Sequence, residues 1–139
     1  MPANGLVTLR SAYGPEETMN RLEAELAAKG LTVFARIDHA AGAEAVGLAL
    51  QPTELLVFGS ARGGTPLMQA ARTVGLDLPL RVLVWQDGAR DTWLTYNDPR
   101  WLARRHGVGR EAAAAVAAMA TMLASLAAAA AAARATSPR

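Results

Sequence analysis

Apolar and polar residues follow each other along residues 5 to 107 in patterns that predict an alternation of strands and helices. Five short runs have the length and spacing of β-strands: residues 6–9, 31–37, 55–58, 80–85 and 92–97. After the first run, Met19, Leu22 and Leu26 recur at steps of three and four residues. That spacing places them on one face of a helix, which must be buried against another element.

Helix end signals predict three helices among these strands. Proline at a first helical position and a capping Asp or Thr mark helix starts, and glycine marks helix ends. By these signals helices occupy residues 15–29, 65–74 and 99–106, and residues 59–64 form a Gly-rich loop. The small-residue stretch at residues 40–50 is interpreted as a short helix.

The last two strands predict a hairpin, because residues 80–85 and 92–97 flank a turn at Asp87 and Gly88. A sheet that contains a hairpin cannot be entirely parallel. The fold class expected is therefore α+β, with helices packed on a mixed or antiparallel sheet in a single domain.

Composition changes near Gly109, so we expect an α+β domain at residues 1–109 and an Ala-rich helical extension with a disordered end at residues 110–139. Residues 112–133 hold no charge and are long enough to cross a membrane. Alanine adds little to insertion, however, and the strongly apolar side chains are few. Of these, Val116, Met119, Leu123 and Leu126 form one stripe. We expect this helix to pack on its own domain or on a second subunit, and residues 5–107 to fold without it.

Composition and charge exclude several classes of function. The chain of 139 residues has no Cys, which removes thiol nucleophiles, disulfides and thiolate metal sites. Its net charge of +2 disfavours nucleic acid as a partner. Residues 1–5 lack a basic and apolar leader, so the cytoplasm is the expected location. The sequence predicts no metal and no cofactor.

The Gly-rich segment is the first candidate site. It follows an apolar strand, as a phosphate-binding loop does, but Thr65 and Pro66 stand where nucleotide hydrolysis requires Lys and Ser or Thr. A simpler site remains open, in which Arg62, Gly64 and Thr65 hold a small anion at a helix start. The alternative is a purely structural loop.

The second candidate site lies at the end of residues 31–37. Asp38 and His39 could act as acid and base, although neighbouring strand residues face opposite ways. An ion pair between Arg36 and Asp38 on one face is geometrically easier. Tyr96 could donate a hydrogen bond to a ligand. With only two His in the chain, a histidine metal site is not expected.

Several separated motifs occur in an order that resembles a known family. They are residues 35–39 (ARIDH), 52–59 (PTELLVFG), 64–68 (GTPLM), 77–80 (DLPL) and 96–99 (YNDP). Over residues 5–109 they resemble the domain-of-unknown-function family 302. The resemblance implies a compact α+β domain that tends to dimerise, and it implies no activity. Some branches of the family carry Cys near positions where this chain has Ser60 to Arg62 and Leu78, so no thiol role is expected here.

These observations favour a cytoplasmic homodimer that binds a small polar or anionic ligand in a cleft at the strand ends. The residues expected to line that cleft are Arg36, Asp38, His39, Arg62, Gly64, Thr65 and Tyr96. Two alternatives stay open. One is an enzyme that uses Asp38 and His39 as acid and base, and the other is an interaction module tethered by its C-terminal helix.

Overall fold

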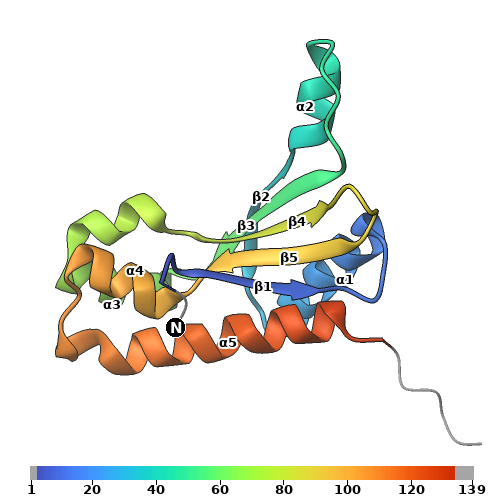
Figure 1. The fold of residues 1–139 in the computed structure, drawn as a ribbon. Coiled ribbons are helices and arrows are strands. Elements are labelled where there is room, and N and C mark those ends of the chain that lie inside the picture. Colours follow the sequence, from blue (N-terminus) through green and yellow to red (C-terminus); the bar gives the residue numbers. More distant parts are fainter. Residues whose placement is uncertain (1–2, 134–139) are drawn as a thin grey trace, which may run out of the picture.

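The structure, a computed structural model that describes residues 3–133, contains one five-stranded sheet in the order β1-β5-β4-β3-β2 (Figure 1). Every neighbouring pair of strands is antiparallel. The strands are β1 (Leu6–Arg10), β2 (Thr32–Asp38), β3 (Thr53–Gly59), β4 (Leu80–Gln86) and β5 (Thr92–Asn97). The expected α+β class is confirmed, and the sheet is antiparallel rather than mixed.

Five α-helices and two short 3-10 helices connect or follow the strands in the described part of the chain. The α-helices are α1 (Pro15–Ala28), α2 (His39–Ala45), α3 (Ala61–Ala70), α4 (Pro99–His106) and α5 (Ala113–Ala131). The 3-10 helices are η1 (Arg72–Asp77) and η2 (Arg110–Ala112). The predicted hairpin is confirmed as β4 and β5, and α4 begins at the predicted cap Asp98.

One predicted element is wrong, because the Gly-rich segment is helical. Helix α3 starts at Ala61, where the Ser60 side chain accepts a hydrogen bond from the Gly63 N–H at 3.1 Å. Thr65 and Pro66 therefore lie inside the helix rather than at its start. The helix ends at Ala70 and not at Val74, which belongs to η1. A serine cap and tertiary packing have overridden the weak helix propensity of two adjacent glycines.

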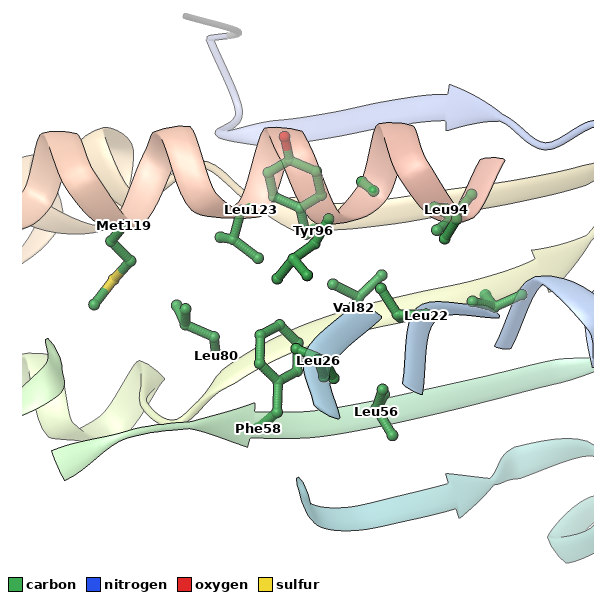
Figure 2. Packing of buried hydrophobic residues seen from close by; sticks show 14 of the residues in the cluster. Leu22, Leu26, Leu56, Phe58, Leu80, Val82, Leu94, Tyr96, Met119 and Leu123 are labelled. Atoms are coloured by element: carbon green, nitrogen blue, oxygen red, sulfur yellow. The ribbon is translucent and has the colours of Figure 1, made fainter. Parts of the chain in front are cut away.

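The core lies on one face of the sheet, which α1 and α5 cover (Figure 1). Figure 2 shows Leu22 and Leu26 of α1 and Leu123 of α5 packing with side chains of the central strands. From the strands, every second residue points into this core: Leu56, Phe58, Leu80, Val82, Val84, Leu94 and Tyr96. That period of two is what a sheet covered on a single face requires.

The Ala-rich helix α5 belongs to this core. The predicted stripe of Val116, Met119, Leu123 and Leu126 is buried, each residue being at most 7% exposed. By length and composition Arg110–Ala131 could cross a membrane, and 33% of its most apolar 18-residue stretch is buried inside the domain. The change of composition near Gly109 is therefore not a boundary of the core. The end expected to be disordered, residues 134–139, lies outside the described residues.

The opposite face of the sheet is not covered by any helix of residues 3–133. Across it runs a row of paired residues, in which Ile37 lies opposite Leu55, Leu55 opposite Leu83, and Leu83 opposite Thr95. Next to this row Trp85 and Trp93 stack, with ring centroids 6.2 Å apart. We call the surface formed by Ile37, Leu55, Leu83, Trp85 and Trp93 the open sheet face.

Truncation after Gly109 is expected to prevent folding, contrary to the expectation from sequence. It removes four large buried side chains, whose burial contributes roughly 6 to 12 kcal/mol, against a total stability of about 5 to 15 kcal/mol for a domain. Circular dichroism during urea titration measures this. Removal of residues 134–139 alone deletes no contact described above and serves as the control. A cooperative transition of the fragment at the full-length midpoint would contradict the expectation.

Candidate functional site

A cleft of about 470 Å³ opens where β3 ends and β4 begins, between these strand ends, α3 and α5. Its walls are mostly apolar and include Leu31, Phe34, Met68, Leu78, Met119 and Met122. Figure 2 shows Met119 reaching from α5 toward Leu80 and Phe58, so the cleft continues directly into the core packing. Its size lies within the range typical of small-molecule sites.

Local irregularities of the chain create this cleft. The register between β2 and β3 shifts between Val33 and Ala35, which leaves Phe34 without a paired residue on β3. Such bulges often redirect a side chain at a functional site. Phe34 is 57% exposed and lies at the cleft.

Two glycines form part of the walls of the cleft, and one of them allows a close approach. A Cβ on Gly64 would lie 3.6 Å from Leu78 Cδ1, and one on Gly75 only 3.2 Å from Met68 Sδ. Both glycines line the cleft. The absence of a side chain at Gly75 lets η1 pack closely against Met68 of α3, whereas a Cβ on Gly64 would make only ordinary contact.

The polar edge of the cleft consists of Ser60 and Arg62, and Arg62 is its only charged lining residue. Arg62 forms no ion pair with any residue between 3 and 133. The Ser60 hydroxyl is already the acceptor for the Gly63 N–H. The cleft therefore combines an apolar interior with one unpaired positive charge near its mouth.

Arg36 lies elsewhere and is part of a structural ion pair. Its guanidinium donates to both carboxylate oxygens of Glu54, at 2.6 and 3.0 Å, and to Asn20 and Glu23 of α1. The hydrogen bond to Glu54 raises the pKa of Arg36, which is charged at any relevant pH. The expected pair between Arg36 and Asp38 is thus wrong, because Glu54 on the adjacent strand is the partner.

Asp38 caps a helix instead of forming an acid and base pair. Its carboxylate accepts the N–H of Ala41 at 2.9 Å and so begins α2, while His39 is the exposed first residue of that helix. Among the hydrogen bonds of the described chain none joins Asp38 to His39. The geometry gives no support to catalysis by these two residues.

Asp38 also lines a second groove, of about 590 Å³, between the body of the domain and the projecting segment that contains α2 (Figure 1). Glu44 and Glu54 line the same groove. With three carboxylates and no basic lining residue, this groove is electrostatically unsuited to an anion.

The remaining predicted site residues line neither the apolar cleft nor the acidic groove. Thr65 is exposed on α3, and Tyr96 is 7% exposed within the core. Burial, and then the charge of Asp98, raise the pKa of the Tyr96 hydroxyl. Of the seven residues expected from sequence, Arg62 and Gly64 meet at the apolar cleft, Asp38 lines the acidic groove, and the others line neither.

The structure also reveals a polar cluster that sequence reasoning missed. Asp77 of η1 accepts hydrogen bonds from Arg105 at 2.8 Å and from His106 Nε2 at 2.5 Å, while His106 Nδ1 lies 3.0 Å from Thr73 Oγ1. Asp77 and His106 are largely buried. Nearly thirty residues separate the two, so no local pattern marks the contact. These hydrogen bonds hold α4 against η1.

The comparisons with known proteins agree with this architecture. A sequence model described as "Domain of unknown function DUF302" matches residues 7–126, and so takes in most of α5. The chain belongs to the DUF302 family. A crystal structure of an uncharacterized conserved DUF302 protein from Bacillus stearothermophilus has a TM-score of 0.79, with 22% sequence identity, and the match covers 89% of this chain and 96% of that one. It shows the DUF302 fold.

Other relatives are longer proteins. The chain is 50% identical over 113 residues to "Fluoride-specific ion channel FluC 1" of Brucella suis, covering 81% of this chain and 44% of that protein. "Fluoride-specific ion channel FluC 2" of Brucella melitensis matches with the same identity, over 42% of its length. The DUF302 chain therefore spans less than half the length of the curated relatives it matches.

Asp98, which caps α4 directly after the strand that carries Tyr96, should make stability depend on acid pH. Its carboxylate accepts bonds from the backbone N–H and the guanidinium of Arg100, which hold the pKa of Asp98 below its ordinary 3.8. This stabilisation is complete above pH 4 and is lost as the pH falls through the folded-state pKa.

Asp98→Asn is therefore expected to lower stability at pH 7 and to flatten its decline in acid, since Asn retains the cap without the charge. Urea midpoints between pH 2 and pH 7 measure this. Part of the decline should persist, because hydrogen bonds led by the Trp93 indole also lower the pKa of Asp87. An unchanged acid profile in Asp98→Asn would contradict the assignment.

Proposed function

We propose that this DUF302 chain is a homodimeric binding domain that takes a small organic anion into the cleft between β3, β4, α3 and α5. The observation that carries the proposal is the composition of the cleft wall, which is apolar except for Ser60 and the unpaired Arg62. Burial of an apolar ligand body supplies affinity, and Arg62 supplies the attraction for negative charge.

A binding role is favoured over an enzymatic one by what the cleft contains. Neither a carboxylate nor an imidazole is among its lining residues. Asp38, the acid of the enzymatic alternative, caps α2 at the opposite end of β3 from the cleft. General acid and base chemistry needs such a group within hydrogen-bonding reach of the ligand.

The names of the Brucella relatives refer to fluoride, but the cleft is poorly suited to that ion. Fluoride is small and strongly hydrated, so its burial requires several hydrogen-bond donors in place of water. The methionine and leucine walls supply none. In this proposal the DUF302 unit of those longer proteins has a binding role of its own, and fluoride serves as a control anion.

The dimer is proposed to form through the open sheet face. A sheet with one uncovered face can bury it against the same face of a second copy, about 10 Å away, in a two-fold arrangement. Leu55, Leu83, Trp85 and Trp93 are half-buried there and would become fully buried. This surface lies on the side of the sheet opposite the core and leaves the cleft accessible.

Filling the cleft should abolish binding of the fluorescent aromatic sulfonate ANS. Gly64→Leu and Ala115→Leu each add a side chain to the cleft wall, from α3 and from α5. At least tenfold weaker saturable fluorescence is expected for both variants. Gly42→Leu is the matched control, because Gly42 is also helical and a Cβ there has no neighbour within 4 Å.

Circular dichroism shows whether each of these variants folds. Because the two substitutions lie on different walls of the cleft, one variant still tests the proposal if the other does not fold. Equal ANS binding by the wild type and by both folded variants would overturn the proposed cleft.

The dimer is tested by Leu83→Asp. A charge buried without a partner costs several kcal/mol at each of two symmetric positions, so we expect at least a hundredfold weaker association and a folded monomer. Leu76→Asp is the control, since Leu76 is 75% exposed on η1, away from the open sheet face. Sedimentation equilibrium at micromolar concentration measures both. A monomeric wild type, or a dimer unaffected by Leu83→Asp, would refute the interface.

A further inference from the structure

We infer that the ligand of the cleft is an amphiphilic monoanion, with one carboxylate bound at Arg62 and an unbranched hydrocarbon tail that extends toward Met119. This inference rests on the proposed function and names the chemical class of its ligand. Four features of the cleft support it: the number of charges, the glycine amides that are already bonded, the methionines, and the depth of the wall.

The charge of the cleft fits a single headgroup. Arg62 is its only charged lining residue, and the Ser60 hydroxyl, which accepts from the Gly63 N–H, can still donate its own proton to the same headgroup. A ligand with a second polar group deep in the cleft would lose water without gaining a partner, which costs about 1 to 3 kcal/mol. One guanidinium pairs well with one carboxylate.

A phosphate ester fits less well because the glycine amides are already used. The N–H groups of Gly63 and Gly64 both donate to the Ser60 carbonyl, at 3.2 and 3.0 Å. Sites for phosphate depend on several free backbone amides directed at the ligand. The Gly-rich segment thus has the composition of a phosphate loop, but once it is folded into α3 its glycine amides are bonded, and only those of Ala61 and Arg62 in the first turn remain without an acceptor in the described chain.

The interior favours a flexible tail. Met68, Met119 and Met122 line the cleft, and methionine adapts its shape to irregular aliphatic partners. Phe34 is the single aromatic lining residue, so no pair of rings sandwiches a planar base. An aliphatic chain uses such walls better than a nucleobase does.

The depth of the cleft separates the headgroup from the tail. Arg62 is an exposed residue of the first turn of α3, whereas Met119 is 7% exposed and packs into the core beside Leu80 (Figure 2). A carboxylate at Arg62 would remain partly hydrated while the tail displaced water from the interior. This is the arrangement in which an amphiphile retains the most favourable interactions at both ends.

Titration calorimetry with hexanoate, octanoate and decanoate tests the inference on the full-length chain. Each added methylene is expected to tighten binding about fourfold until the cleft is filled. Decanol should bind at least tenfold more weakly than decanoate, and inorganic phosphate and fluoride should not bind.

Arg62→Gln should weaken decanoate binding at least tenfold and leave decanol unchanged, since only the headgroup contact is removed. Arg72→Gln is the matched control, because Arg72 is exposed and does not line the cleft. Equal affinities for decanoate and decanol, or no effect of Arg62→Gln, would overturn the ligand class.

Failure of the ligand class can be told apart from failure of the proposed function. If Gly64→Leu abolishes ANS binding but decanoate does not bind the wild type, the cleft stands and the ligand class is wrong. If ANS binding is also unaffected, both are wrong. Sedimentation with anionic phosphatidylglycerol vesicles, without binding of free decanoate, would make the source of the anion a membrane surface and would likewise overturn the inference.

Discussion

The structure depends on the need to cover one apolar face of a five-stranded sheet. Side chains from β3, β4 and β5 alternate so that Leu56, Val82 and Leu94 point to the same side, and each is fully buried. One helix about 10 Å wide cannot cover strands spaced about 4.8 Å apart over this width. The Ala-rich helix α5 is therefore a necessary second half of the layer formed with α1.

Small residues let these two helices approach closely, and a cation fixes their relative position. Arg21 of α1 donates to the carbonyl oxygens of Ala129 and Ala130 at the end of α5, at 3.1 and 3.2 Å. Positive charge at a helix C-terminus satisfies carbonyl groups that have no partner within the helix. At the opposite end α5 passes α3, and the space that methionines fill incompletely is the cleft.

Local signals in the sequence predicted the elements well where the decisive contacts are local. The apolar run at residues 80–85, the turn between β4 and β5, and the Asp98 cap each depend on a few neighbouring residues. The Gly-rich segment misled because glycine is typical of loops, whereas here Gly64 lies within a helix and beside Leu78, which is far from it in the chain. The contact of Asp77 with His106 is equally nonlocal.

The candidate site was predictable in part for the same reason. Arg62 and Gly64 could be selected because a strand followed by a glycine-rich turn is a local feature. Arg36 was misassigned because its partner, Glu54, comes from the neighbouring strand. The register between two strands cannot be inferred from the sequence of either strand alone. Phe34 and the three methionines carry no signal of a site, since apolar residues are read first as core.

Some arginines of the domain form ion pairs that stabilise the fold, whereas Arg62 is available to a ligand. Arg36 and Arg105 each have a carboxylate partner that joins two elements, whereas Arg62 has none among the described residues. In the proposed complex that one charge adds a fixed increment to the affinity, while each methylene in the cleft adds its own. A cleft that ends at Met119 therefore discriminates ligands by length, because methylenes beyond that point would remain in water and add nothing.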